Sequence, residues 1–297
     1  MILIIALIII STLGVLILNL SEERFVLENY IESQINTEEI IFASKSAEKA
    51  LKKLLDRDDK SVDYIGELWS QTIPVSLNDI NIQIEIIDQE RFLNPNFLVN
   101  GTTINEKHKL VFERLFDILN INYAILYNII EWIDKDDLPN NGGKEDYNLY
   151  MAKNDKLDTL EELKLIEGIN DNIYNGTVEG GYFKPGFRSL FSPYSNGKVN
   201  INTASKWILM ALDNDIDEAL ANEIIIYRQR KPFKNIKDLV LVDGFNSDIL
   251  YRIENMIDVK SENFLAKIDI TKGERKYKMI ILLNRQNKTK IVWRKLY

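Results

Sequence analysis

The chain has 297 residues, of which 45% are hydrophobic and 28% charged, and this is the composition of a folded globular protein of about two domains. It contains no cysteine, which excludes disulfides, cysteine-ligated zinc, iron–sulfur clusters and thiol nucleophiles, and a lone His108 argues against a Ser-His-Asp triad or a multi-histidine metal centre. The net charge of −8 argues against nonspecific binding of the whole chain to nucleic acid.

The first predicted element is a membrane-spanning helix. Residues 1–20 carry no charged side chain, and at about 1.5 Å per residue they span roughly 30 Å, the thickness of one hydrocarbon core. Neither a basic n-region nor a cleavage site of small residues accompanies this run. The run therefore predicts a retained transmembrane anchor over residues 1–21 rather than a signal peptide.

An amphipathic helix is predicted to continue the anchor without a break. No glycine occurs between Gly14 and Gly66 and no proline in this stretch, while apolar residues recur at spacings of three and four. We therefore expect one helix of roughly 85 Å over residues 1–58. The alternative is an anchor, a break near Ser21 and a separate soluble helix.

Strands are predicted before and after a large helical block. Residues 81–86 alternate polar and apolar side chains, as a half-buried strand does, and Asn94-Pro95-Asn96 ends that part of the chain. Three C-terminal strands joined by short polar turns are predicted over residues 264–270, 276–283 and 289–294.

The block between these strands is predicted to be an all-α insertion. Its candidate helices cover residues 104–119, 122–133, 159–167, 203–212, 216–230, 235–241 and 246–257. The expected fold class is therefore α+β: a long N-terminal helix on a small antiparallel sheet, interrupted by a large α-domain. The expected segments are the transmembrane half at 1–21, the amphipathic helix and first strands at 22–101, the α-domain at 102–260 and a β-meander at 261–297.

An internal repeat lies inside the helical block. Residues 161–174 align with residues 237–250, and in each copy a glycine, Gly168 or Gly244, is followed two positions later by an asparagine. Glycine suits the left-handed position after one helix, and asparagine caps the next. Each copy is predicted to be a helix, a glycine turn and a capped helix, and two packed hairpins explain the repeat without a ligand.

Charge is segregated along the chain. Residues 131–179 hold 13 acidic residues against 5 lysines, whereas residues 264–297 hold 10 basic residues against 2 acidic ones. Asp134, Asp136 and Glu145 have the spacing of positions 1, 3 and 12 of an EF-hand, but leucine and proline at positions 5 and 6 exclude that motif. Oxygen ligands on such a loop suit calcium, and a solvated acidic loop is the alternative. The candidate calcium ligands are Asp134, Asp136, Glu145 and Asp146.

No catalytic residue is assigned, and we expect no enzyme. Paired carboxylates could form a glycosidase-like site, but acids on a loop without a sugar-binding platform are weak support for such an enzyme. The aromatic loop at residues 180–187 is expected to pack over the α-domain, with a partner contact as the alternative. His108 is expected to lie at the surface.

Five stretches follow the N-terminal helix in a fixed order. They are IDQERF at 87–92, EWIDKDD at 131–137, GKEDY at 143–147, ELKLIEG at 162–168 and VNINTA at 199–204. With these motifs the chain resembles, over nearly its whole length, the GspK family of minor pseudopilins in bacterial type II secretion systems. The resemblance implies a pilin-like helix and sheet interrupted by an α-domain that binds calcium.

The resemblance also implies a place and a set of partners. A minor pseudopilin is anchored by a single span in the bacterial inner membrane, with the bulk of the chain in the periplasm. Its partners are other minor pseudopilins, GspI-like and GspJ-like, and exported substrates are further candidates, whereas nucleic acid is not expected.

Residue 5 favours a position at the tip of the pseudopilus, with the general apolarity of a transmembrane helix as the alternative explanation of its side chain. In major pilins a glutamate there pairs with the N-terminal amine of the neighbouring subunit inside an apolar fibre. Ile5 lacks that carboxylate, so with Met1 as the mature first residue the subunit is expected to cap the fibre. No basic leader precedes the apolar run, and Met1 is either the processed first residue or lies downstream of the true start.

The exposed side of the amphipathic helix is the predicted partner contact. More apolar side chains lie between residues 25 and 43 than one small sheet covers. The predicted partner-binding residues are Phe25, Tyr30, Ile31, Ile35, Ile41 and Phe42.

A rival function comes from residues 199–258, which also resemble the helix-hairpin-helix DNA-binding repeats of competence proteins. Such hairpins bring backbone amides to phosphates. Here the first hairpin, residues 212–217, carries three acidic residues and the second adds Asp243, so phosphate would meet repulsion.

Overall fold

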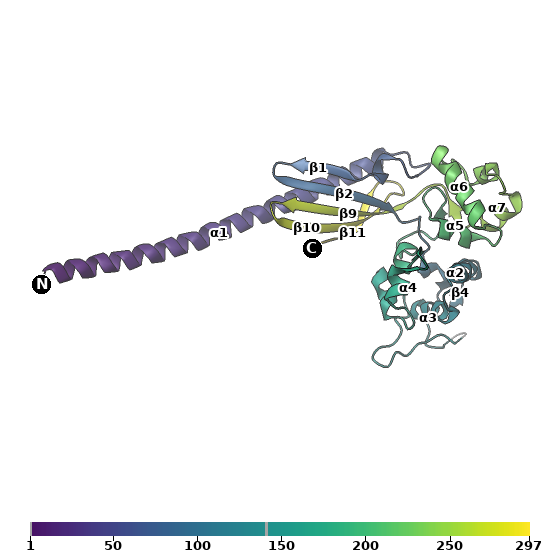
Figure 1. The fold of residues 1–297 in the computed structure, drawn as a ribbon, viewed down its shortest axis with the longest axis horizontal. Coiled ribbons are helices and arrows are strands. Elements are labelled where there is room, and N and C mark those ends of the chain that lie inside the picture. Colours follow the sequence, from purple (N-terminus) through teal and green to yellow (C-terminus); the bar gives the residue numbers. More distant parts are fainter. Residues whose placement is uncertain (1, 140–141) are drawn as a thin grey trace.

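The structure is a computed structural model that describes residues 2–139 and 142–297, with side chains at all of these positions except 2, 3, 6, 8 and 9. Its first element is one helix, α1 (Ile2–Arg57), which extends away from the rest of the molecule in Figure 1. The predicted continuous helix is confirmed, and no break occurs near Ser21. Met1 lies outside the described residues.

Only the C-terminal half of α1 packs on the body of the protein. Its buried residues recur every three or four positions, which places them on one stripe that faces the sheet. These residues are Ile40, Ala43, Ala47, Leu51 and Leu55. Within the part of the chain that is described, no helix combines the length and apolarity needed to cross a membrane.

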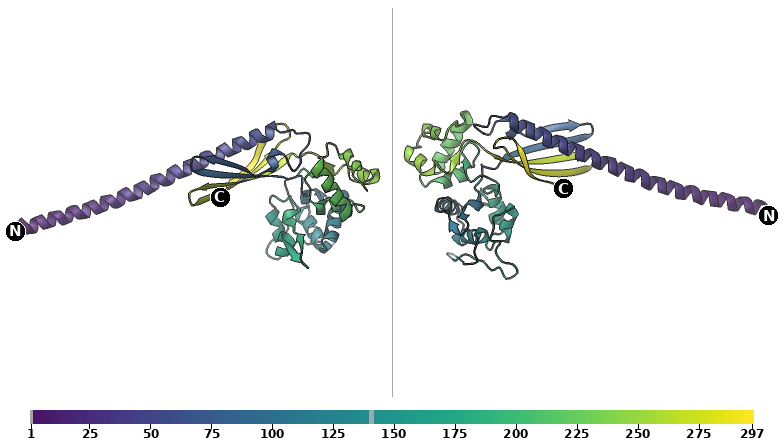
Figure 2. Two further views of the ribbon diagram at one scale, coloured as in Figure 1. Left: turned by 45° about the horizontal axis from the view of Figure 1, so that its top comes forward. Right: turned by 180° about the vertical axis from the view of Figure 1, so that it is seen from behind.

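A five-stranded antiparallel sheet covers this stripe (Figure 2). Its spatial order is β1-β2-β9-β10-β11, so the insertion separates two strands that pair in register, with Ile84 opposite Ile268. The predicted strands are confirmed. The strands are β1 (Ile73–Leu77), β2 (Ile80–Asp88), β9 (Asn263–Lys272), β10 (Arg275–Asn284) and β11 (Lys290–Leu296).

The hydrophobic core of the insertion begins soon after β2. Strand β2 ends at Asp88, and the second hydrophobic core already includes Leu93, Leu98 and Val99. The predicted boundary at residue 102 therefore lies inside this core. The insertion is not purely helical, because its described residues include three two-stranded pairs. These are β3 (Val99–Asn100) with β4 (Thr103–Ile104), β5 (Gly176–Glu179) with β6 (Tyr182–Pro185), and β7 (Val199–Asn200) with β8 (Ile257–Asp258).

The helices of the insertion form two parts in Figures 1 and 2, one with α2, α3 and α4 and one with α5, α6 and α7. Both contribute to one core, and the insertion lies beyond the end of the sheet that is remote from the N-terminus of α1. The α-helices are α2 (Glu106–Ile118), α3 (Tyr123–Ile133), α4 (Asp171–Asn175), α5 (Lys206–Leu212), α6 (Glu218–Arg230) and α7 (Ser247–Ile253).

The internal repeat is confirmed in the structure. Each copy is a 3₁₀ helix, a glycine with positive φ and an asparagine-capped α-helix, and Asn170 and Asn246 accept hydrogen bonds from the amides of the helices they precede. The first helix of each copy is 3₁₀ rather than α-helical, η3 (Leu160–Leu165) and η5 (Ile236–Leu241). The other 3₁₀ helices are η1 (Leu68–Ser70), η2 (Pro95–Phe97) and η4 (Phe187–Ser189).

Candidate functional site

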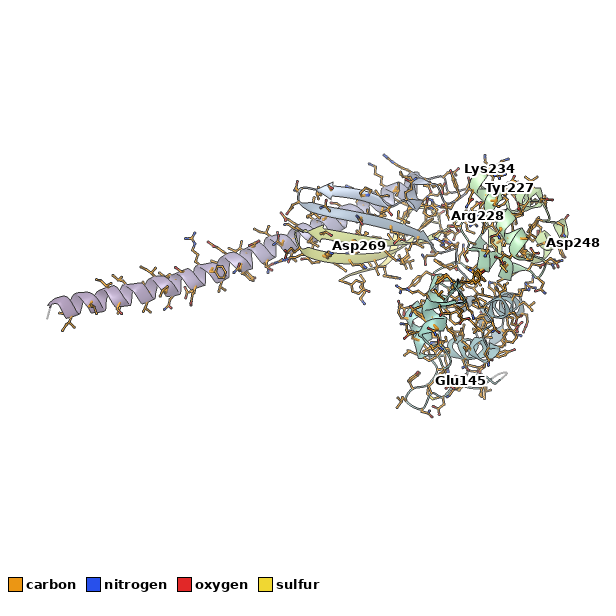
Figure 3. The ribbon with its side chains drawn as sticks, in the orientation of Figure 1. Glu145, Tyr227, Arg228, Lys234, Asp248 and Asp269 are labelled. Carbon is orange, nitrogen blue, oxygen red and sulfur yellow. The ribbon has the colours of Figure 1, made fainter. Side chains whose placement is uncertain are left out.

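Three buried carboxylates meet at the C-terminal end of α3. Glu131 lies in the last turn of this helix, Asp134 is its C-cap, and Glu145 approaches from the following loop. One ligand atom from each lies within 4.8 Å of the others, and the three residues are between 0% and 7% exposed. Figure 3 shows Glu145 on the α2–α4 part of the insertion, away from the sheet.

The environment of Glu145 is unfavourable for a carboxylate without a cation. Both of its carboxylate oxygens are buried, and neither has a hydrogen-bond partner among the described residues. Burial, with Glu131 and Asp134 close by, raises the pKa of Glu145 to about 8. Oxygen ligands that share one calcium ion at about 2.3–2.6 Å lie at most about 5 Å apart, so the group fits calcium.

Gly143 allows the loop to approach Glu131. A Cβ atom at this position would lie 2.3 Å from Cγ of Glu131 and 3.0 Å from the carbonyl oxygen of Tyr127. A larger residue would therefore separate the loop from α3, and glycine is needed to bring Glu145 to the other two carboxylates.

The structure brings together two of the four predicted ligands. Asp134 and Glu145 belong to the group, whereas Asp136 and Asp146 lie outside it and each closes a local turn, accepting hydrogen bonds from the amides of Leu138 (2.9 Å) and Asn148 (2.8 Å). The sequence prediction missed Glu131. The signal was present, because residues three apart on a helix share a face and Glu131 precedes Asp134 by three positions.

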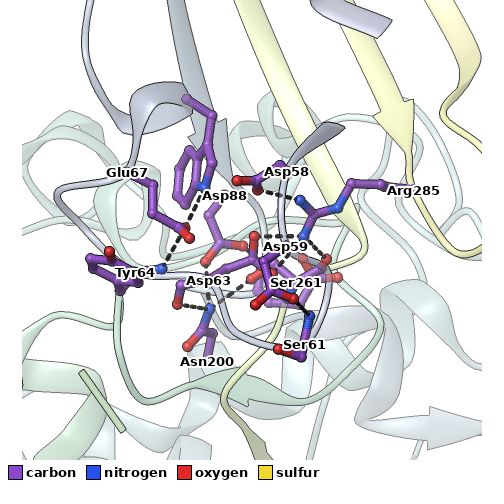
Figure 4. Close-up of polar contacts among 12 residues, drawn as sticks. Asp58, Asp59, Ser61, Asp63, Tyr64, Glu67, Asp88, Asn200, Ser261 and Arg285 are labelled. Atoms are coloured by element: carbon purple, nitrogen blue, oxygen red, sulfur yellow. Dashed lines mark hydrogen bonds and ion pairs between the residues drawn. The ribbon is translucent and has the colours of Figure 1, made fainter. Parts of the chain in front are cut away.

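A second group of acids, Asp58, Asp63 and Glu67, contains its own cation (Figure 4). The side chain of Arg285 is 1% exposed and donates hydrogen bonds to Asp58 (2.6 Å) and to both carboxylate oxygens of Asp63 (2.5 and 2.6 Å). Glu67 accepts a hydrogen bond from the indole of Trp69. A guanidinium therefore pairs with two acids of this group and an indole with the third, and we assign no metal to it.

Two further buried acids, Asp88 and Glu90, join the sheet to the insertion. Asp88 accepts hydrogen bonds from the hydroxyl of Thr203 (2.5 Å) and the side-chain amide of Asn200 (3.3 Å). Glu90 accepts from the backbone and side-chain amides of Asn263. The motifs at 87–92 and 199–204 therefore meet in a polar junction, and burial raises the pKa of both acids.

The six predicted partner-binding residues of α1 are all exposed. Their exposed fractions range from 42% for Ile41 to 66% for Phe25, and Tyr30, Ile31, Ile35 and Phe42 lie between these values. They precede or flank the stripe that faces the sheet. Ile5 is also exposed, and Met1 lies outside the described residues.

Two smaller predictions are corrected. His108 is half-buried: its ring stacks on Phe97 at 5.6 Å, its Nε2 lies 3.2 Å from the carbonyl oxygen of Gly197, and burial lowers its pKa. The aromatic loop at 180–187 packs only in part: Tyr182 and Phe183 of the β5–β6 hairpin are exposed, whereas Phe187 is buried in the core of the insertion.

The acidic residues of the helix-hairpin-helix segment have structural partners. Asp213 accepts two hydrogen bonds of 2.7 Å from Arg252, and Asp217 caps α6 through the amide of Leu220. The first hairpin is thus closed by carboxylates where a phosphate-binding hairpin presents free amides.

Comparison with known proteins agrees with this architecture. Residues 91–177 match a family model described as type II secretion system (T2SS), protein K, and residues 195–258 match a helix-hairpin-helix motif. The fold matches one chain of the crystal structure of the GspK-GspI-GspJ complex from enterotoxigenic Escherichia coli Type 2 Secretion System, with a TM-score of 0.70, 20% identity, and coverage of 90% of this chain and 98% of that chain. The resemblance to GspK-type minor pseudopilins is confirmed.

The carboxylate group lies in the segment that matches the protein K family model. Glu131, Asp134 and Glu145 all lie within the protein K segment at 91–177. No curated protein matches the chain.

Proposed function

We propose that the protein is a minor pseudopilin at the tip of a type II secretion pseudopilus, where it initiates or caps assembly with other minor pseudopilins and supports protein export. One observation carries this proposal: a protein K segment at residues 91–177 is built into a fold shared, over 90% of the chain, with a chain of the GspK-GspI-GspJ complex. We infer a structural, non-enzymatic role.

The position of the insertion supports a place at the tip. It occupies residues between Asp88 and Asn263 and lies at the end of the sheet remote from the start of α1 (Figure 1). A subunit placed above it in a narrow shaft would collide with this domain. Ile5 agrees with the same position, because a capping subunit needs no carboxylate for an amine above it.

The N-terminal helix is the proposed anchor and partner contact. Residues 1–21 would insert into the inner membrane as a single span and leave the bulk of the chain in the periplasm. The exposed apolar residues of α1 between Phe25 and Phe42 would then pack against helices of GspI-like and GspJ-like subunits.

Calcium is the proposed ligand of the carboxylate group. Glu131, Asp134 and Glu145 supply hard oxygen ligands at mutual distances that suit this ion, and the buried oxygens of Glu145 need a positive partner. When bound, calcium would neutralise this negative charge and stabilise the insertion. Backbone carbonyls and water complete the shell in such sites.

Co-expression with candidate GspI-like and GspJ-like partners tests the proposed role. The full-length protein should co-purify with them from membranes, and Ile35→Asp should abolish the complex, because a charge would enter an apolar helix contact. Leu241→Asp is the control, since Leu241 is 58% exposed on the insertion and should retain the complex. A protein that stays alone beside every candidate partner would contradict the proposal.

DNA uptake is the alternative function, and the helix-hairpin-helix match at 195–258 favours it. The acids of both hairpins oppose it, since Asp213 and Asp217 close the first hairpin and Asp243 is exposed in the second. Binding of duplex DNA with a steep dependence on salt would support this alternative.

A further inference from the structure

Residues 145–152 form a small closed loop that starts at the proposed metal ligand, and we call them the Glu145 loop. The amide of Ala152 donates a 2.7 Å hydrogen bond to the carbonyl oxygen of Glu145, which closes the base. Inside it, the amide of Tyr147 donates to the carbonyl of Tyr150 at 3.0 Å. The tip carries Leu149, which is 93% exposed.

Aromatic packing is the first contact that holds the loop on α3. Tyr147 and Tyr150 stack with their ring centres 5.2 Å apart, and both rings lie edge-on to Trp132 at 5.6 and 6.1 Å. The hydroxyl of Tyr150 also donates a 2.6 Å hydrogen bond to the carbonyl oxygen of Leu165. These contacts favour the docked loop at any metal concentration.

The carboxylate group is the second contact, and the metal decides whether this group attracts or repels the loop. Trp132 lies between Glu131 and Asp134 in sequence, so the carboxylates and the aromatic cluster share one end of α3. Without a cation, ionisation of Glu145 is opposed by two buried carboxylates at short range. A divalent cation converts this repulsion into attraction at the same positions.

We propose that calcium held by Glu131, Asp134 and Glu145 controls the docking of the Glu145 loop on α3, so that metal occupancy decides how Leu149 and the neighbouring Met151 are presented at the surface. The inference rests on the proposed calcium site. It adds a consequence of occupancy: the ion orders a loop with an apolar tip in addition to stabilising the domain.

Limited proteolysis of the full-length protein in detergent tests the proposal. Chymotrypsin cleaves after leucine, tyrosine and methionine in a segment that opens from the folded structure, so cleavage at Leu149, Tyr150 and Met151 reports an undocked loop although these side chains are partly exposed in the docked one. If the undocked loop lacks the metal site, calcium at 100 times its dissociation constant should slow cleavage there about 100-fold relative to chelator. Trp132 gives a second readout, because its fluorescence should change on calcium addition and this change should disappear in Trp132→Phe.

Two variants distinguish an effect of the bound metal on cleavage from other effects of calcium. Glu145→Gln removes one of the three charges at nearly constant size, so cleavage in chelator should become slower and should lose most of its calcium dependence. Asp155→Asn is the matched control, because Asp155 is an exposed acid outside the group and this variant should keep the full calcium effect.

Calorimetry on the same samples distinguishes calcium binding from its effect on loop docking. Calcium binding with unchanged cleavage at the loop would overturn this inference and leave the calcium site standing. No calcium binding would overturn both, whereas the pseudopilin role is judged separately by co-purification with partners.

Discussion

Arg285 and Asp63 form a buried ion pair that joins the last strands of the sheet to the loop after α1. They lie 222 residues apart in sequence, their side chains are 1% and 0% exposed, and they are linked by hydrogen bonds of 2.5 and 2.6 Å. Ser261 adds to the contact, since its amide donates to Asp63 and its carbonyl accepts from Arg285. The pair therefore lies where the sheet, the end of α1 and the insertion meet.

Removal of one member of this pair should be costly. Arg285→Met would leave the charge of Asp63 buried without its cation, and we expect a loss of about 3–5 kcal/mol in the free energy of unfolding. Urea denaturation followed by circular dichroism measures this. The double variant Arg285→Met, Asp63→Asn should recover part of the loss, and a single variant with an unchanged midpoint would contradict the assigned role of the pair.

Stability should fall as pH rises because of Asp88 and Glu90. Burial raises the pKa of both acids in the folded protein, so the folded state binds more protons than the unfolded state above their ordinary pKa of about 4. Their contribution to stability is complete below about pH 4 and declines as pH rises towards the folded-state values. The measurement is the urea midpoint from pH 5 to pH 9.

Glu90→Gln should flatten this pH dependence and raise stability at the alkaline end, since the amide has no charge to bury. Glu85→Gln is the control, because Glu85 lies on β2 with a half-exposed side chain 3.7 Å from Lys267 and should keep the wild-type slope. A Glu90→Gln profile parallel to wild type would exclude the buried acid as the cause.

The packing of α1 on the sheet gives a third prediction. Leu51 is 1% exposed in the core beneath the sheet, and Leu51→Asp should destabilise the protein by several kcal/mol, on the order of 4 kcal/mol, because a charge would enter an apolar site. Lys53→Asp, at an exposed position two residues later, should change stability by no more than about 0.5 kcal/mol. Equal melting temperatures for wild type and Leu51→Asp would reject this packing.

The ligand set of the metal site can be tested by thermal unfolding. Calcium at 100 times its dissociation constant should stabilise the wild type by about 2.7 kcal/mol. Glu131→Gln should lose most of this effect, whereas Asp136→Asn should retain it because Asp136 lies outside the group. The reverse ranking of the two variants would favour the ligands predicted from sequence over those that the structure brings together.

Local pattern determined the longest helix, most strands of the main sheet and the two capped turns of this protein. The repeat of apolar residues every three or four positions predicted α1, alternation over residues 81–86 predicted β2, and the paired glycine and asparagine signals predicted both capped turns. Each signal depends on the chemistry of neighbouring residues, which tertiary contacts did not override. Strand β1 was missed because Pro74 cannot donate a ladder hydrogen bond, and an edge strand tolerates it.

Only the tertiary structure decided which polar groups act together. Four acids on a loop gave no means of telling that Asp134 and Glu145 turn inward while Asp136 and Asp146 close turns. The spacing of Glu131 and Asp134 indicates a shared end of α3, but only the packing of the loop brings Glu145 to them. The same holds for the motifs at 87–92 and 199–204, whose acids and amides pair across more than a hundred residues. Periodicity states which face of an element is buried, whereas the partner of a buried carboxylate depends on how distant elements pack, and that packing is set by the apolar core around them.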